Sequence, residues 1–222
     1  MKGQESGVTS QEPEGTLVCF ALEEEAAPFR KMSLEKNNIS ILITGIGREN
    51  AENVVREFLK SNAPNFVVTC GFAGGLNPDL KVGAAVFSTD NKSLRERLQG
   101  ANAREAKIFC ATRIAITRAE KETLRTSTGA DVVEMESEVI QSICRERGIA
   151  CATVRAISDT AGEDLPLDFN QLSKPDMNLD YGKLAWALAK SPTKIPDLLK
   201  LQKRCRLAAE NLAEVLVKVI FR

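Results

Sequence analysis

The sequence contains no histidine, and this absence excludes several kinds of chemistry at once. Histidine is the usual general base, the common partner of nucleophilic Ser and Cys, and a frequent metal ligand. Any catalysis by this chain must therefore use carboxylates, Lys, Tyr, Ser, Thr or backbone groups.

Paired cysteines are also missing, because none of the six cysteines forms a C-x-x-C motif. Zinc sites usually combine such pairs, or combine Cys with His. Most of the six lie in apolar runs, and we interpret them all as reduced packing residues rather than ligands. They are Cys19, Cys70, Cys110, Cys144, Cys151 and Cys205. We expect neither a metal nor another cofactor.

The chain has no excess of charge, since 30 basic residues balance 30 acidic ones. A net charge of zero gives no electrostatic indication of binding to nucleic acid or to an anionic membrane. No apolar run approaches the roughly 18 residues of a membrane span. Residues 1–15 are polar and lack the apolar centre of a signal peptide. We therefore predict a cytoplasmic protein with no nucleic-acid partner and no membrane span.

The length of 222 residues favours one domain, because domains typically take about 150 residues. With 43% hydrophobic and 27% charged residues, the composition is that of an ordinary globular protein. Residues 1–15 carry turn formers and acids without periodicity, which predicts a disordered tail. The single domain is expected to span residues 16–222.

Short apolar runs alternate with segments of helical periodicity along the first two thirds of the chain. Strands are predicted over Leu17–Leu22, Ile39–Thr44, Phe66–Cys70, Val82–Phe87, Ile108–Ala111, Val132–Val133 and Ala152–Ile157. Helices are predicted over Glu23–Lys31, Glu49–Lys60, Ala119–Arg125 and Met135–Arg147. Nearly all-apolar strands separated by helices indicate a three-layer α/β/α sandwich with a central mixed, mostly parallel sheet.

The C-terminal part reads as two helices, over Leu179–Lys190 and Ile195–Phe221. In the second helix an apolar stripe is expected to pack on the sheet; it consists of Leu212, Val215, Leu216 and Val219. The charged segment Asn91–Ala106 is interpreted as a solvated helix or loop.

Four places that follow predicted strands are candidate binding regions, because ligands of open α/β sheets bind beyond the carboxyl ends of the strands. They are Glu23–Glu25, Thr44–Gly47, Cys70–Leu76, and the pair Val133–Ser137 and Arg155–Asp159. Each also has a purely structural explanation, such as acids at a helix start, a tight glycine turn or a capping aspartate. A dinucleotide-binding oxidoreductase is disfavoured because Asn50 takes the place of the third glycine after Gly45 and Gly47.

Taken together, five motifs resemble one known family. They are A-L-E-E-E at 21–25, T-G-I-G-R at 44–48, C-G-F-A-G-G-L-N-P-D-L-K-V-G at 70–83, V-E-M-E-S at 133–137 and V-R-A-I-S-D-T-A at 154–161. In this order and spacing they are similar to the nucleoside phosphorylase/nucleosidase superfamily. By motif, the methylthioadenosine/S-adenosylhomocysteine nucleosidases are the branch most similar, over residues 17 to 168.

The resemblance implies a role for three acids. Glu25 would orient or activate the attacking water, Glu136 would hold the ribose hydroxyls, and Asp159 would protonate the purine at N7. Met135 would lie against the sugar and Ser158 beside the acid. Three further positions of the motifs are candidates for substrate contact: Phe72, Gly74 and Glu134.

This assignment agrees with the chemistry of the reaction. Breaking an N-glycosidic bond develops an oxocarbenium-like sugar and an anionic base, which acids below the sugar and beside the base stabilise. A general acid must keep its proton near neutral pH, which burial against an apolar surface favours. Glu136 must instead stay ionised to accept hydrogen bonds from two hydroxyls.

The nucleophile is open between water and phosphate. Glu25 favours hydrolysis, whereas Gly47 and Arg48 could hold a phosphate. Residues 110–113, 117–121 and 191–196 also resemble the hopanoid-associated phosphorylase branch, which implies phosphorolysis of an adenosyl-lipid as an alternative. The segment Ala111–Ile116 lacks the aromatic ring on which a purine stacks in the nucleosidases. A nucleoside-binding protein without turnover is a further alternative, and the resemblance implies a homo-oligomer.

Overall fold

The computed structural model describes residues 15–33, 38–172, 174 and 180–221. The predicted tail at residues 1–15 lies almost wholly outside these described residues. Eight strands form one sheet: β1 (Thr16–Phe20), β2 (Ile39–Ile43), β3 (Phe66–Gly75), β4 (Ala85–Ser88), β5 (Arg104–Glu105), β6 (Ile108–Cys110), β7 (Val132–Glu134) and β8 (Ala150–Asp159).

Eight α-helices and one 3-10 helix accompany the sheet in the described part of the chain. They are α1 (Glu23–Ser33), α2 (Arg48–Phe58), α3 (Lys92–Gly100), α4 (Arg118–Thr128), α5 (Ser137–Glu146), α6 (Phe169–Leu172), α7 (Tyr181–Lys190), η1 (Pro192–Lys194) and α8 (Ile195–Ile220).

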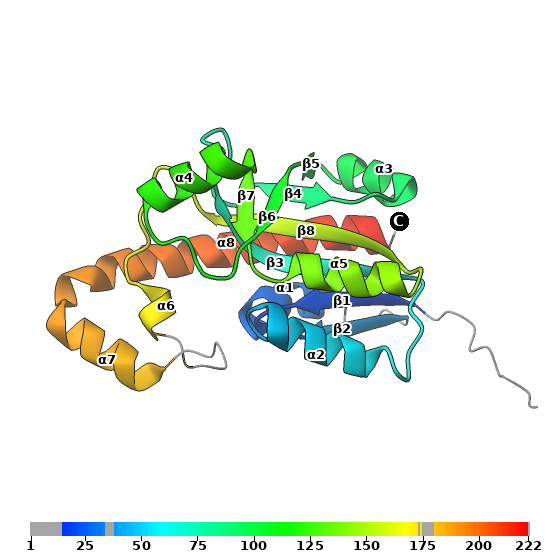
Figure 1. The fold of residues 1–222 in the computed structure, drawn as a ribbon, viewed down its shortest axis with the longest axis horizontal. Coiled ribbons are helices and arrows are strands. Elements are labelled where there is room, and N and C mark those ends of the chain that lie inside the picture. Colours follow the sequence, from blue (N-terminus) through cyan, green and yellow to red (C-terminus); the bar gives the residue numbers. More distant parts are fainter. Residues whose placement is uncertain (1–14, 34–37, 173, 175–179, 222) are drawn as a thin grey trace, which may run out of the picture.

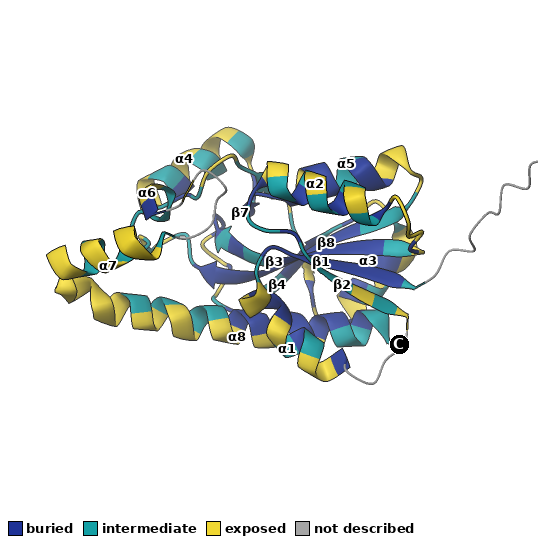
Figure 2. Cartoon of the chain, turned by 90° about the horizontal axis from the view of Figure 1, so that it is seen from below, coloured by how far each residue is buried: buried dark blue, intermediate teal, exposed yellow. Residues whose placement is uncertain are grey.

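The strands follow the order β2-β1-β3-β8-β4-β5, and β7 joins β3 to β6. The pairs of β1 with β2 and β3, and of β3 with β8, are parallel, whereas β4 with β8 and β3 with β7 are antiparallel. Helices α2 and α5 cover one face, and α1 and α8 cover the other (Figure 1, Figure 2). The predicted mixed, mostly parallel α/β/α sandwich is confirmed.

The long last helix, α8, packs its C-terminal half on the sheet. Its buried residues begin at Ala208 and include the predicted stripe of Leu212, Val215, Leu216 and Val219. They join the core cluster that contains Val68 of β3 and Val154 of β8. This burial anchors the two central strands, whose carboxyl ends carry the candidate residues.

The glycine-rich segment after Cys70 is an extended strand and not a turn. Strand β3 continues to Gly75, pairing Gly71 with Arg155 and Gly74 with Asp159 of β8. A register shift between Ala73 and Gly74 bends the strand and lets it pair with β7 as well. The prediction that β3 stops at Cys70 was therefore wrong, because β8 and β7 supply ladder partners for the glycines.

None of the helices in the described part of the chain has both the length and the apolarity needed to cross a bilayer. All six cysteines are free thiols, as predicted, and three of them are buried.

Candidate active site

Glu25, the third glutamate of the string at the start of α1, is buried with 4% of its surface exposed, whereas the two before it are exposed. Its Oε2 accepts hydrogen bonds from the backbone N–H groups of Ala21 and Leu22, both at 3.0 Å. Its Oε1 accepts from the N–H of Phe72 in β3, at 2.8 Å. The start of α1 therefore fixes this carboxylate against the middle strand of the sheet.

Two glycines of β3 leave the space that two carboxylates occupy. A Cβ at Gly71, which has φ +150°, would lie 2.8 Å from Oε1 of Glu25. A Cβ at Gly74 would lie 3.4 Å from Oδ2 of Asp159. The glycine segment thus admits one acid near its start and another near its end.

Arg155 of β8 links Glu134 and Glu136, the two glutamates of the V-E-M-E motif. Its side chain is 1% exposed, and its Nη2 lies 2.5 Å from Oε2 of Glu134 and 3.7 Å from Oε2 of Glu136. The other oxygen of Glu136, Oε1, accepts a hydrogen bond from the N–H of Gly47 at 2.8 Å. Strand ends far apart in the sequence therefore share one buried charge network.

The two glutamates of this network have different tasks. Burial alone would raise the pKa of Glu134, but Arg155, Ser137 and backbone N–H donors outweigh it, and the net shift is downward. For Glu136, burial raises the pKa, while the charge of Arg155 opposes this and Glu134 adds to it. Glu134 thus serves as the counter-ion of Arg155, and Arg155 is the main group that favours the ionised form of Glu136.

The guanidinium of Arg155 has more hydrogen-bond donors than its described partners use. Its Nε and Nη1 are buried and have no hydrogen-bond partner within the part of the chain that the structure describes. Buried donors in folded proteins are normally satisfied by protein or by water. These two nitrogens are therefore available to an oxygen of a water molecule or a substrate.

Glu25 belongs electrostatically to the same group. Burial raises the pKa of Glu25 to about 7; the N–H of Phe72 opposes this shift, the charge of Glu136 adds to it, and Arg155 opposes it. A carboxylate with a pKa near the working pH is suited to accept a proton from water.

Asp159, the last residue of β8, is buried against a cation. Its Oδ2 lies 2.5 Å from Nζ of Lys121, which is 0% exposed, and its Oδ1 accepts a hydrogen bond from Ser158 at 2.7 Å. The same Nζ donates to the carbonyls of Thr160 and Glu163, at 2.8 and 2.9 Å. All three protons of the ammonium are thereby used.

Helix α4 places Lys121 at this position. A capping box between Thr117 and Glu120 sets the start of the helix, and Lys121 follows directly. The apolar surface expected beside Asp159 is thus interrupted by an ammonium group, because the first turn of α4 points a long cationic side chain at the end of β8.

Cys205 of α8 is a partly buried thiol. Burial raises the pKa of this thiol to about 11, and the charges of Asp159 and Glu25 add to the shift. We call Glu25, Glu136 and Asp159 together the carboxylate cluster.

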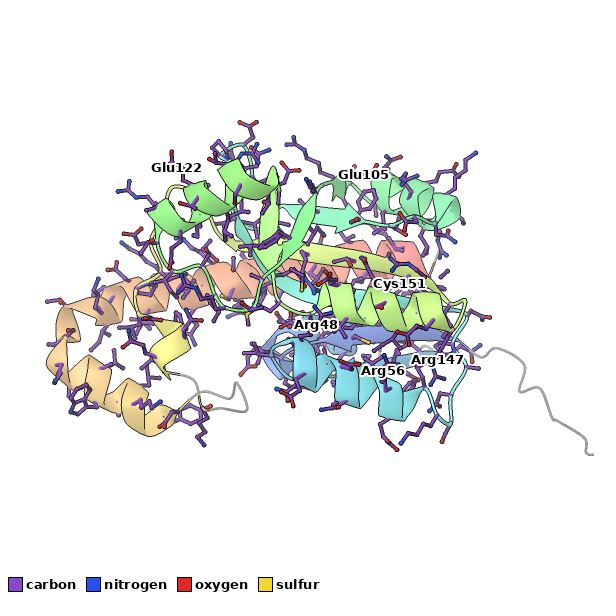
Figure 3. The ribbon with its side chains drawn as sticks, viewed as in Figure 1. Arg48, Arg56, Glu105, Glu122, Arg147 and Cys151 are labelled. Atoms are coloured by element: carbon purple, nitrogen blue, oxygen red, sulfur yellow. The ribbon has the colours of Figure 1, made fainter. Side chains whose placement is uncertain are left out.

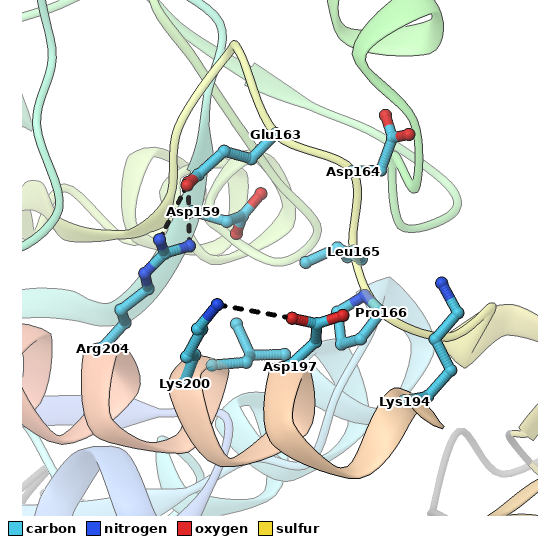
Figure 4. A pocket seen from close by; sticks show the side chains of 10 residues that line it. Asp159, Glu163, Asp164, Leu165, Pro166, Lys194, Asp197, Lys200 and Arg204 are labelled. Carbon is cyan, nitrogen blue, oxygen red and sulfur yellow. Dashed lines mark hydrogen bonds and ion pairs between the residues drawn. The ribbon is translucent and has the colours of Figure 1, made fainter. Parts of the chain in front are cut away.

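A cavity of about 310 Å³ opens beside Asp159 (Figure 4). One wall is the loop from Glu163 to Pro166, and the other is the first half of α8 with η1. Arg204 of α8 and Glu163 of the loop form a two-point ion pair, at 2.9 and 2.7 Å, across it.

A second cavity, of about 500 Å³, lies between β6 and α4. Part of the segment Ala111–Ile116 lines it, together with Phe109, an aromatic residue that the sequence reasoning passed over. The backbone of Ile114 exchanges two hydrogen bonds with the side chain of Asn170, both at 2.9 Å, which fixes this segment. Neither of these two cavities is lined by Glu25 or Glu136.

The other candidates from the sequence lie close to these groups. Met135, which stands between the two glutamates in the sequence, is buried. Gly47 donates its backbone N–H to Glu136. Arg48 lies at the start of α2, and its Nη1 is 2.8 Å from Glu138 of α5 (Figure 3). Both of the groups proposed for a phosphate are thus engaged by carboxylates.

Sequence reasoning missed Lys121 and Arg155. Arg155 had a signal, since a charge within a strand that is otherwise apolar must find a buried partner. Lys121 had none, because it stands among eight other polar residues in α4 and only the fold shows that it points inward.

Comparisons with known proteins identify the family of the chain. The family model described as "Phosphorylase superfamily" matches residues 20–112 and 91–189. A 5′-methylthioadenosine/S-adenosylhomocysteine nucleosidase of Anoxybacillus flavithermus is 28% identical over 178 residues, covering 64% of this chain and 77% of the relative. The enzyme of the same name from Haemophilus ducreyi is 29% identical over 168 residues, covering 60% and 72%.

Two solved structures share the fold. A mutant of the Helicobacter pylori 5′-methylthioadenosine nucleosidase with 5′-methylthioadenosine in its active site has a TM-score of 0.73 at 16% identity, covering 95% of this chain and 99% of that one. Futalosine hydrolase of Helicobacter pylori has a TM-score of 0.71 at 16% identity, covering 94% and 97%. The chain therefore belongs to the phosphorylase superfamily, as its motifs indicated, and it is an enzyme.

Proposed function

We propose that the protein hydrolyses the N-glycosidic bond of a purine nucleoside or a 5′-substituted adenosine. The observation that carries the proposal is a set of three buried carboxylates: Glu25 and Asp159 lie against the glycine segment of β3, and the charge of Glu136 acts on Glu25. Relatives named as nucleosidases support hydrolysis as the reaction. The homo-oligomer remains a prediction.

Glu25 acts as the general base. The oxygen of water attacks C1′ of the sugar as the bond from C1′ to the base nitrogen breaks, and Glu25 takes the proton of the water. Its raised pKa, about 7, makes both protonation states accessible at neutral pH. We expect the two buried donors of Arg155 that lack a partner among the described residues to bind the oxygen of this water.

Asp159 supplies a proton to the departing base, which accepts the electron pair of the broken bond. Lys121 is a positioning residue here, because its ammonium fixes one carboxylate oxygen while Ser158 fixes the other. The proton that Asp159 gives to the base is replaced from solvent through the cavity that Asp159 lines.

Glu136 accepts hydrogen bonds from the two sugar hydroxyls and stabilises the positive charge that develops on the ring. Arg155 and the N–H of Gly47 hold this carboxylate in place. Water is favoured over phosphate as the nucleophile because Gly47 and Arg48 are already engaged by Glu136 and Glu138.

The test is free-base release from adenosine, methylthioadenosine and inosine, with and without phosphate. We expect release from at least one of them that is independent of phosphate. A strict requirement for phosphate would establish phosphorolysis instead. Nucleoside binding without release of base would identify a binding protein that lacks turnover.

Asp159→Asn is expected to lower base release about 1,000-fold, since general acids contribute roughly 10²- to 10⁴-fold. Its control is Asp90→Asn, which removes an exposed carboxylate that lines neither cavity. Thermal unfolding of both variants checks the fold. Near-normal release from Asp159→Asn would remove this residue from the acid role.

A further inference from the structure

Residues 181–203, comprising α7, η1 and the first part of α8, project from the sheet as a helical hairpin, which we call the arm (Figure 1). None of the residues of α7 or η1 is buried, and the buried residues of α8 begin only at Ala208. The arm is coloured almost wholly as exposed or intermediate in Figure 2. Its helices therefore present side chains that the core does not use.

Aromatic and aliphatic side chains are concentrated on the arm. The single Tyr and the single Trp of the chain are both here, as Tyr181, 76% exposed, and Trp186, 63% exposed. Ile195 and Leu199 are exposed as well. The described part of the chain has six exposed large hydrophobic residues, and four of them thus lie within these 23 positions. Such side chains are usually buried, so their concentration on one surface indicates a contact site.

The arm is also basic, although the whole chain has a net charge of zero. It contains five lysines and one acid, Asp197, so its net charge is +4. The lysines are Lys183, Lys190, Lys194, Lys200 and Lys203. The net charge of the whole chain is zero and gave no indication of an anionic partner. The arm nevertheless has a local excess of positive charge.

Both kinds of side chain occur together on α7. The ammonium of Lys190 lies 3.5 Å from the centre of the Trp186 ring, so the cation and the aromatic ring share a face one helical turn apart. Trp and Tyr favour the level of lipid headgroups, and lysine on an amphipathic helix is attracted to anionic lipids.

We propose that the arm is a docking surface for an anionic lipid bilayer, with Trp186 and Tyr181 in the headgroup region and the lysines on the lipid phosphates. Charge complementarity selects this occupant. A second copy of the arm would bring one charge of +4 against another, which opposes a symmetric contact. Ile195 and Leu199 are aliphatic, so they cannot stack on nucleic-acid bases as an aromatic ring does. The acyl chains of lipids, in contrast, can surround aliphatic side chains.

Docking would also place the cavity beside Asp159 next to the lipid surface. Lys194, Asp197, Lys200 and Leu201 of the arm form one wall of that cavity, and Asp159 lies in it (Figure 4). The inference itself rests on the arm alone and stands whether or not the carboxylate cluster acts on a nucleoside.

The test uses the fluorescence of Trp186, which reports on the arm without a label because the chain has no other Trp. The full-length chain is titrated with vesicles of phosphatidylcholine containing phosphatidylglycerol, and with vesicles of phosphatidylcholine alone. We expect a blue shift and sedimentation with the anionic vesicles, both reduced by salt because surface electrostatics is screened. Equal response to both vesicles, or no shift at all, overturns the proposal.

A charge-reversed variant tests the lysines. Lys183→Glu, Lys190→Glu and Lys203→Glu combined should weaken vesicle binding about 100-fold, since each basic residue near an anionic surface contributes on the order of tenfold or somewhat less. The matched control, Lys31→Glu, Lys81→Glu and Lys92→Glu combined, changes the net charge equally at exposed positions off the arm and should bind as the wild type does. Equal weakening in both variants would contradict a role for the arm.

Two further titrations test the other candidate partners of the arm, a second copy of the chain and nucleic acid. A blue shift without vesicles that grows with protein concentration would identify a second copy, and a shift with single-stranded oligonucleotide but not with vesicles would identify nucleic acid. Either result overturns the lipid proposal. Base release from soluble nucleosides, measured on both triple variants, should be unchanged, and it separates failure of the arm from failure of the active site.

Discussion

The carboxylate cluster and the arm use charge in opposite ways. In the cluster, Arg155 and Lys121 are buried and each is held by carboxylates on neighbouring elements. On the arm, the lysines are exposed: Lys190 lies over the Trp186 ring, Lys183 donates to the carbonyl of Gln171, and Lys200 lies 3.6 Å from Asp197. A buried charge must be paired where it lies, and its pairing therefore controls reactivity and stability. An exposed charge adds little stability and can be reached from solvent.

Lys121→Met should have the largest effect on stability, because it leaves Asp159 as an unpaired buried charge. We expect the free energy of unfolding to fall by about 3–5 kcal/mol, measured by denaturant titration. The double variant Lys121→Met/Asp159→Asn removes both charges and should regain part of this loss. Arg118→Met, at an exposed position of the same helix, serves as the control and should change little. A double variant no more stable than the single one would argue against the ion pair as the cause.

Glu25→Gln should alter how stability depends on pH. The folded pKa of about 7 lies above the ordinary value of 4.5, so the protonated carboxyl favours the folded state. That contribution is complete below pH 4.5 and is lost as pH rises through 7. Relative to Glu25→Gln, the wild type should therefore lose about 3 kcal/mol between pH 4.5 and pH 8. Unfolding of both proteins at the two pH values measures this difference, and Glu24→Gln, at an exposed position, should show none.

Gly71→Ala should damage the cluster without disturbing the arm. The new Cβ would lie 2.8 Å from Oε1 of Glu25, at a φ of +150° that favours glycine. We expect about 1–3 kcal/mol of lost stability and at least tenfold slower base release, as for other strained sites. Gly100→Ala adds a Cβ with nothing within 4 Å and is the matched control. Wild-type rates in Gly71→Ala would show that the position of Glu25 is not critical.

Trp186→Ala should have the smallest effect on the folded protein. The ring is exposed, and its contact with Lys190 is a surface contact. We expect a change within about 0.5 kcal/mol in stability and unchanged base release, measured by calorimetry and product assay. A loss of several kcal/mol would mean that the arm is part of the core, and the contrast between the two regions would fail.

Most of the fold could be predicted from the sequence because apolar periodicity follows burial directly. The strands at 16–20 and 39–43 and the stripe of α8 are examples. The extension of β3 through Gly71 to Gly75 could not be predicted, since its cause is pairing with β7 and β8, which lie about 60 to 85 positions later. Propensity gives no information on such distant partners.

The candidate residues followed from the motifs, but their partners did not. The motifs named Glu25, Glu136 and Asp159, whereas the contact of Lys121 with Asp159 joins residues 38 positions apart. The helices of the arm were predicted, but its positive charge was not noticed because the net charge of the whole chain is zero. Contacts and local charge both depend on which side chains the fold turns inward, and a linear pattern does not contain that information.

The most direct test of the central claim is a crystal structure of the protein with an uncleavable 5′-substituted adenosine analogue. We expect one bound molecule whose sugar hydroxyls contact Glu136, whose base N7 lies within hydrogen-bonding distance of Asp159, and whose C1′ faces a water held by Glu25. An analogue bound away from these three carboxylates, or touching only one of them, would contradict it.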